Sequence, residues 1–289
     1  MTQLRFALAQ IDTCVGALDA NAAKVLDYSR KAAAGNAQVV VFPEMTLTGY
    51  PIEDLALRRT FRQAAWDKAN ELATQLNDDG LGDLFVVVGT VGTDRKTSKP
   101  RNRLVVLHQA WSGLATTSTS CPTTGVFDEF RIFSAGDRSV TLDVDGATIG
   151  VAICEDIWQD GGPVADLATK NIDLLLTING SPYEEGKTNT RFELAQRRAA
   201  EVNAPVIYLN QSAVKTTSLR RRQLRGRRRR HAYRTQPDVH GKPDVLGLRF
   251  RRRTSAKPRS FRNSTRTKRY TPPACSASRT TWPRTTSPA

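Results

Sequence analysis

The cysteine pattern of this 289-residue chain lacks the spacings of a metal site or of a disulfide framework. The four cysteines, Cys14, Cys121, Cys154 and Cys275, lie far apart in the sequence and form no paired motif. The chain also lacks an apolar run of membrane-spanning length, and its first residues begin a strand pattern rather than a signal peptide. These absences predict a reduced, cytoplasmic protein with no membrane segment and no metal site.

Acidic residues are nearly absent from the C-terminal tail. The whole sequence has a net charge of +15, yet residues 1–211 contain 20 Lys and Arg against 26 Asp and Glu. Residues 212–289 contain 23 against 2, and are otherwise rich in Ser, Thr and Pro. A tail of this composition cannot bury a core, so we expect it to be disordered. No helix-turn-helix, zinc-finger or aromatic pattern accompanies the charge, and nucleic acid should bind the tail only non-specifically.

Apolar runs and helical periodicities alternate along residues 1–211. Buried or alternating apolar runs predict strands, and spacing near 3.6 residues predicts helices. The predicted strands are residues 4–10, 37–42, 84–90, 103–107, 139–144, 147–153, 172–178 and 204–209. The predicted helices are residues 21–34, 57–76, 162–170 and 190–202. This alternation predicts an α/β fold whose sheets are covered by helices, with a hairpin turn at Asp145-Gly146.

Polar residues follow three of the predicted strands, at the position where α/β folds build their sites. Glu44 lies in FPE, Cys154 in ICEDIW, and Ser181 and Lys187 in NGSPYEEGK; Glu129 lies in the separate motif GVFDEFRIF. A cysteine thiol and a carboxylate are the groups that nucleophilic catalysis with a general base requires. Each residue alone also has a structural explanation, as a buried cysteine, a helix-start acid, a turn serine or a solvated lysine.

The order and context of these motifs resemble the nitrilase, or carbon–nitrogen hydrolase, superfamily. More closely, they resemble the glutaminase domain of bacterial glutamine-dependent NAD synthetases. The resemblance covers residues 1–211 apart from a patch at 110–124. It implies a nitrilase-type αββα sandwich.

The resemblance also implies a role for each motif residue. Cys154 would be the nucleophile that attacks the amide of L-glutamine, and Glu44 the general base and acid. Ser181 and Lys187 match positions that hold the substrate, and Glu129 would help to order the site.

The patch departs from the family pattern. Where the family has a segment similar to YDKHFLPNYGVFDE, this chain has TTSTSCPTT before GVFDE, so Ser118 replaces the family's lysine and Thr124 its substrate-contacting tyrosine. One codon spelling of YDKHFLPNY gives TTSTSCPTT when it is read one nucleotide later. Residues 223–232 can likewise be respelled as SFVVGADGT. We therefore interpret 110–124 and 212–289 as out of frame, and we expect impaired activity.

The family resemblance implies a second domain and its cofactors. In the intact family, an ATP-dependent synthetase domain uses the released ammonia to amidate deamido-NAD, and ATP and Mg²⁺ belong to that domain. This sequence contains no SGGxDS-type phosphate loop, so we expect that domain to be absent and the glutaminase part to need no cofactor. We also expect the sandwich to be incomplete at its C-terminal end, with uncovered sheet edges. The family's homo-oligomerisation is a weaker expectation here, because segments that could build interfaces are garbled.

Two alternatives remain open. A stand-alone amidase acting on another small amide would need a lysine from elsewhere in the chain, and would hydrolyse small amides without a glutamine preference. A basic nucleic-acid-binding protein would show a preference for particular nucleotide sequences, and this preference would be lost when residues 212–289 are removed.

Overall fold

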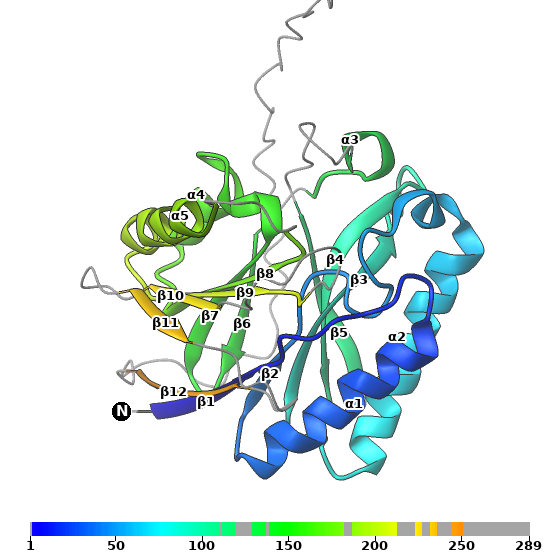
Figure 1. Ribbon diagram of the computed structural model, residues 1–289, viewed down its shortest axis with the longest axis horizontal. Coiled ribbons are helices and arrows are strands. Elements are labelled where there is room, and N and C mark those ends of the chain that lie inside the picture. Colours follow the sequence, from blue (N-terminus) through cyan, green and yellow to red (C-terminus); the bar gives the residue numbers. More distant parts are fainter. Residues whose placement is uncertain are drawn as a thin grey trace, which may run out of the picture. The chain divides into compact units, whose positions relative to one another are not determined.

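Continuous runs of Val and Leu form the central strands of two six-stranded β-sheets in the computed structural model of the protein (Figure 1). The structure describes residues 2–109, 111–118, 129–136, 139–181, 187–212, 223–226, 232–235 and 244–250. All of them lie in a compact unit that spans Met1–Ala256. Among these described residues, no helix has the length and apolar character needed to cross a membrane.

The first sheet has the strand order β12-β1-β2-β3-β4-β5. Its first five strands along the chain are β1 (Thr2–Leu8), β2 (Val39–Val41), β3 (Phe85–Thr93), β4 (Pro100–His108) and β5 (Trp111–Thr117). β1, β2 and β3 are parallel, and β4 and β5 continue the sheet as antiparallel strands. The outer face of this sheet is covered by α1 (Leu18–Ala34) and α2 (Arg59–Asp78) (Figure 1).

The second sheet has the strand order β11-β10-β9-β8-β7-β6. Its strands are β6 (Val140–Val144), β7 (Ala147–Ile153), β8 (Leu174–Asn179), β9 (Val206–Asn210), β10 (Gln223–Gly226) and β11 (Ala232–Thr235). β7, β8 and β9 are parallel, while β6 and β7 form an antiparallel hairpin. The outer face of this sheet is covered by α4 (Gly162–Thr169) and α5 (Lys187–Glu201) (Figure 1).

The main hydrophobic core lies between the two sheets. Phe6 and Val87 of the first sheet belong to the same buried cluster as Val151 and Leu176 of the second. Separate apolar clusters join each sheet to its own pair of helices. The layer order is therefore helix, sheet, sheet, helix, and the predicted αββα sandwich is confirmed.

The strands and helices predicted within residues 1–211 are confirmed, with their ends shifted by a few residues. The hairpin turn is a clear case, because Val144 pairs with Ala147 and both turn residues have positive φ, 50° at Asp145 and 79° at Gly146. This is the type I′ geometry that Asp-Gly favours. Sequence periodicity did not indicate the short elements η1 (Glu53–Leu57), α3 (Glu129–Ile132) and η2 (Cys154–Ile157), or the strand β5 in the Thr- and Ser-rich patch.

The structure differs from the expectation after β9, where the sequence predicts no further strand. β10 pairs antiparallel with β9, β11 with β10, and β12 (Asp244–Phe250) with β1. Leu246 and Leu248 of β12 pack against the core between the sheets. Backbone groups at a sheet edge can pair with any extended segment whatever its side chains, so composition alone does not reveal such strands. The sheet edges at β1 and β9 are therefore paired, whereas the sequence analysis expected uncovered sheet edges.

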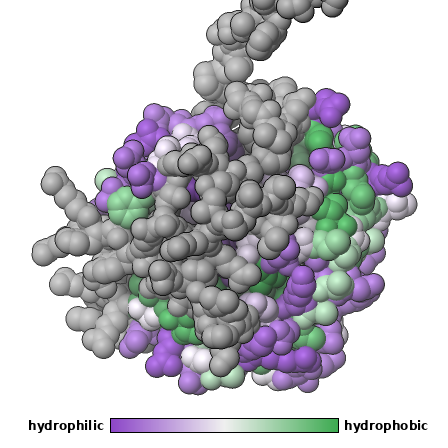
Figure 2. All heavy atoms as spheres, in the orientation of Figure 1, coloured by the Kyte–Doolittle hydropathy of each residue, from purple (hydrophilic) through white to green (hydrophobic). Residues whose placement is uncertain are grey.

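Hydrophobic residues also gather on one side of the molecular surface, to the right of the face in Figure 2. η1 includes Leu57, whose side chain is exposed, and Leu55, which packs against a small buried cluster around Met45.

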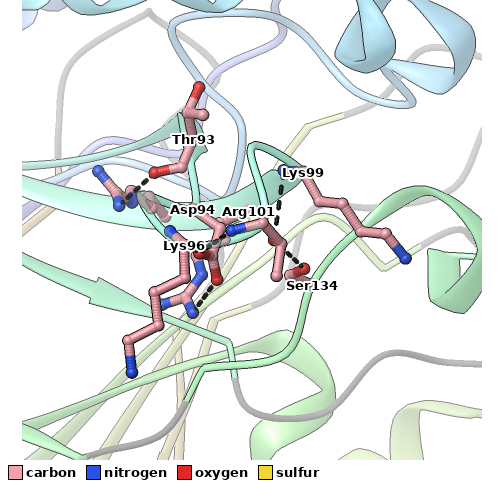
Figure 3. Close-up of polar contacts among 8 residues, drawn as sticks. Thr93, Asp94, Lys96, Lys99, Arg101 and Ser134 are labelled. Atoms are coloured by element: carbon pink, nitrogen blue, oxygen red, sulfur yellow. Dashed lines mark hydrogen bonds and ion pairs between the residues drawn. The ribbon is translucent and has the colours of Figure 1, made fainter.

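A buried carboxylate holds the turn between β3 and β4 (Figure 3). Asp94 accepts hydrogen bonds from the backbone N–H groups of Lys96 at 2.6 Å and Thr97 at 3.0 Å, and pairs with Arg101. Burial alone would raise the pKa of Asp94, but these N–H groups and the guanidinium outweigh it and lower that pKa below its usual value. The ionised carboxylate therefore stabilises the turn that leads into β4.

We expect Asp94→Asn to lower the free energy of unfolding at pH 7 by about 1–3 kcal/mol, because hydrogen bonds to a charged group are lost. Since folding lowers the pKa of Asp94, the contribution of its carboxylate to the free energy of unfolding is complete above about pH 3.9, the pKa of Asp in an unfolded chain. This contribution disappears as the pH falls through the lower pKa that Asp94 has in the folded protein. Urea unfolding between pH 7 and pH 3 should show a shallower pH dependence for Asp94→Asn than for wild type. The matched variant at exposed Asp83, Asp83→Asn, should behave as wild type; equal slopes for all three proteins would contradict this assignment.

Candidate active site

Glu44 lies just beyond the carboxyl end of β2, and two donors fix its carboxylate. The side chain is only 1% exposed. Oε1 accepts a hydrogen bond from Nδ2 of Asn102 at 2.6 Å, and Oε2 accepts one from the backbone N–H of Gly180, also at 2.6 Å. Asn102 lies in β4 and Gly180 follows β8, so the carboxylate of Glu44 connects the two sheets.

The backbone around Glu44 fits against β3 because residue 89 is glycine. A Cβ at Gly89 would lie 2.4 Å from the nitrogen of Met45 and 2.7 Å from Cα of Glu44, which backbone atoms cannot accommodate. Met45 itself has a φ of 51°, a conformation that non-glycine residues rarely adopt. The close approach and the sharp turn together place the Glu44 side chain at the end of the sheet.

Cys154 begins η2 directly after β7 and has a φ of 43°. Left-handed conformations at non-glycine residues are uncommon and cluster at functional sites. Within the described residues the thiol forms no disulfide; it is half-buried, and its Sγ lies 3.6 Å from Oγ of Ser181. Because Ser181 directly follows Gly180, the sulfur of Cys154 and the carboxylate of Glu44 contact two consecutive residues beyond β8.

β9 holds Ser181 in place. Oδ1 of Asn210 accepts a hydrogen bond from the Ser181 N–H at 2.9 Å, and Nδ2 of Asn210 donates to the Ser181 carbonyl at 3.0 Å. The Ser181 hydroxyl lies 3.4 Å from the hydroxyl of Tyr208. Burial, together with the nearby Cys154, raises the pKa of Tyr208 far above its usual value, so this phenol stays protonated.

Ser118 brings the Thr- and Ser-rich patch to the same site. Its backbone N–H donates to the carbonyl of Asn102 at 3.0 Å, and its buried Oγ donates to Oδ1 of Asp156 at 3.0 Å. Asn102 is the partner of Glu44, and Asp156 lies in the turn that begins at Cys154. The position where the family resemblance expects a lysine therefore borders both halves of the site.

Of three further positions named from the sequence, two are described only in their backbone and one is not described. Glu129 begins α3 and Lys187 begins α5, but their side chains lie outside the described part of the structure. Thr124 lies outside the described residues altogether. The roles of Glu129 and Lys187, like the catalytic roles of the residues above, stay predictions.

Sequence reasoning did not single out several residues that hold the site together. Asn210 ends the apolar run of β9, and that change to a polar residue is the signal that could have identified it. Asn102 lies between two arginines at the polar start of β4 and gave no comparable signal, although its buried amide needs hydrogen-bond partners. Tyr208 and Arg198 gave no such signal. A tyrosine in a strand and an arginine in a helix are ordinary sequence features.

Arg198 of α5 holds the segment that follows η2. Its Nε donates to the carbonyl of Ile157 at 2.6 Å, and Nη2 donates to the carbonyl of Gln159 at 2.6 Å and to Oδ1 of Asp160 at 3.1 Å. Nη1 pairs with Glu201. With contacts from all three of its nitrogens, this guanidinium fixes the end of the η2 turn against α5.

We expect Arg198→Met to lower the free energy of unfolding by about 2–4 kcal/mol, because buried carbonyls and a carboxylate lose their donor. The neighbouring Arg197 provides a matched control, since its side chain is 53% exposed whereas that of Arg198 is 2% exposed. Arg197→Met should stay within about 0.5 kcal/mol of wild type in urea unfolding. Equal losses in the two variants would show that Arg198 has no special role.

The site combines a thiol, a buried carboxylate and a hydroxyl within a small region. A thiolate is a good nucleophile, and a carboxylate can take up and return a proton. Within the described ranges, no group of three or more His, Cys, Asp or Glu side chains could hold a metal ion. The arrangement suits nucleophilic attack on a carbonyl carbon.

Comparison with known proteins gives a family match for most of the chain. The family described as carbon-nitrogen hydrolase matches residues 5–239, which include β10 and β11. Among curated proteins, the chain is 31% identical over 211 residues to a glutamine-dependent NAD(+) synthetase of Acinetobacter baylyi. It is 36% identical over 212 residues to the protein of that name from Xylella fastidiosa.

These relatives are much longer than the matching segment. The alignments cover 73% and 72% of this chain but only 38% and 37% of the two relatives. A solved glutamine-dependent NAD+ synthetase from Acinetobacter baumannii has a TM-score of 0.73 and 27% identity, covering 85% of this chain and 45% of that one. An amidase of the nitrilase superfamily from Nesterenkonia shares the fold, with a TM-score of 0.69 at 15% identity, covering 85% of this chain and 89% of that one.

Proposed function

Because the chain belongs to the carbon–nitrogen hydrolase family, we propose that it hydrolyses the side-chain amide of L-glutamine, with Cys154 as nucleophile and Glu44 as general base and acid. The observation that carries this proposal is that the Cys154 sulfur and the Glu44 carboxylate contact the adjacent residues Ser181 and Gly180. The curated relatives are glutamine-dependent enzymes by name, which supports glutamine as the substrate.

The proposed reaction proceeds through a thioester. Glu44 accepts the thiol proton while the sulfur of Cys154 bonds to the amide carbon and the carbonyl π electrons move to oxygen. The oxygen electrons return as the C–N bond breaks, and Glu44 gives its proton to the departing nitrogen, so ammonia leaves. Glu44 then takes a proton from a water molecule whose oxygen attacks the thioester carbon. The C–S bond breaks, glutamate forms, and the sulfur recovers its proton from Glu44, which is a carboxylate again at the end of the cycle.

The hydrogen bonds to Glu44 suit this double role. Asn102 and Gly180 each bind one carboxylate oxygen, so the group cannot rotate freely. A carboxylate held in one orientation can receive and return a proton without first reorganising. We propose Ser181 and Lys187 as residues that hold glutamine, and Glu129 as a residue that orders the site.

We further propose that this chain is a weak catalyst. The developing oxyanion in such a reaction is usually stabilised by positioned donors or cations. The residue at position 118 is a neutral serine whose hydroxyl is engaged by Asp156, so it supplies no positive charge to the site.

We propose that the released ammonia serves an ATP-dependent synthetase domain that amidates deamido-NAD. The named relatives support this, since the chain spans less than two fifths of their length. The hydrolysis itself would need neither ATP nor Mg²⁺, because a thiol and a carboxylate supply all the proton transfers. A cytoplasmic setting suits it, since thiols stay reduced there.

Ammonia release from a panel of amides tests the proposal. Folded full-length protein at high concentration would be incubated with L-glutamine, L-asparagine and small aliphatic amides. We expect slow ammonia release from L-glutamine and none from the other amides. Robust hydrolysis of other amides without a glutamine preference would instead identify a stand-alone amidase.

A further inference from the structure

Tyr208 lies in β9, and its hydroxyl approaches Ser181, the residue that contacts the sulfur of Cys154, the candidate nucleophile. Its ring packs in the cluster between the second sheet and α4 and α5, and its side chain is 1% exposed. Among the described residues, its hydroxyl has one hydrogen-bond partner, Oγ of Ser181 at 3.4 Å. A buried tyrosine hydroxyl normally needs such a partner.

Ser181 stands between this phenol and the sulfur. Its Oγ is 3.4 Å from the Tyr208 hydroxyl and 3.6 Å from Sγ of Cys154. A serine hydroxyl has a single proton to donate, so it can donate to only one of the two. If Tyr208 donates to Ser181, the serine proton is left for the sulfur.

We propose that Tyr208 is a positioning residue that fixes the direction of a hydrogen-bond chain, from its own hydroxyl through Ser181 to the sulfur of Cys154. The chain gives the thiolate a donor before any substrate arrives. This inference rests on the proposed role of Cys154 as nucleophile and adds to it a residue that acts only through Ser181.

The charges around Tyr208 agree with a fixed direction. Cys154 in η2 and Glu44 after β2 oppose ionisation of the phenol, while Arg191 in α5 favours it. Burial has the largest effect and keeps the phenol protonated, so Tyr208 remains a donor when the thiol loses its proton. A hydrogen bond donated to a thiolate stabilises it and lowers the pKa of the thiol.

The test is the pH dependence of Cys154 alkylation by iodoacetamide in the full chain, followed at the Cys154 peptide by mass spectrometry. In Tyr208→Phe, which keeps the ring, we expect the Cys154 pKa to rise by about one unit and alkylation below that pKa to slow about tenfold. Ser181→Ala should produce a similar rise. The double variant should add little to either, because both changes break one chain.

Tyr28→Phe on α1 is the matched control and should leave the Cys154 pKa unchanged. An unchanged pKa in Tyr208→Phe or in Ser181→Ala, on protein with wild-type unfolding, overturns the inference; Ser181→Ala decides alone if Tyr208→Phe does not fold. Additive shifts in the double variant also overturn it. Alkylation requires no glutamine, so shifted pKa values without any ammonia release would reject the proposed function and retain the hydrogen-bond chain.

Discussion

Cys154→Ala is expected to abolish covalent capture of a thiol-reactive glutamine analogue, whereas the wild-type chain should incorporate up to one equivalent. The adduct requires a sulfur placed where the substrate's electrophilic carbon binds. Loss of the nucleophile should also reduce ammonia release by at least about 10³-fold, as in other enzymes with covalent intermediates. Intact-mass spectrometry measures capture directly and does not depend on fast turnover.

Cys14 provides the control for this experiment. Like Cys154, it forms no disulfide within the described residues, but it is exposed and lies in the loop before α1. Cys14→Ala should therefore label as wild type does. Undiminished labelling of folded Cys154→Ala would reject the assigned nucleophile.

Replacing residues 116–124 by YDKHFLPNY is expected to raise the rate of glutamine hydrolysis by about 10²–10³-fold, the usual worth of an oxyanion-stabilising group. The reason is the place of residue 118. Its backbone N–H is hydrogen-bonded to the carbonyl of Asn102, and its hydroxyl is hydrogen-bonded to Asp156 in η2, the turn that begins at Cys154. A lysine there would bring a positive charge beside both halves of the site.

A second segment replacement separates the lysine from the rest of the patch. The variant YDSHFLPNY, which retains Ser118, should fold as well as the first but show little of its gain. The measured quantity is the ammonia release rate at saturating L-glutamine. Equal rates in the two variants would mean that the missing charge does not limit this chain.

The sequence predicted those parts of the structure that depend on local patterns. Val39–Val41 is a continuous apolar run, and Leu174–Ile178 is apolar except for Thr177; the strands that they form are buried at every position. Glu44 and Cys154 stood out because each directly follows such a run. The pairing of Asn102 with Glu44 could not be predicted, because it depends on how β4, on the far side of β3, is placed relative to the end of β2. β10 to β12 were missed because backbone pairing at an edge leaves little trace in side-chain composition.

The two oxygens of Glu44 are bound from opposite layers of the sandwich, one from Asn102 in β4 and the other from Gly180 after β8. The carboxylate that we propose as the proton-transfer group is therefore sensitive to the alignment of the two layers. A substitution deep in the shared core, even one remote from the sulfur, would pull one oxygen away from its donor if it let one sheet slide over the other. We therefore expect the site to lose activity at displacements of one sheet relative to the other that are smaller than those that unfold the protein.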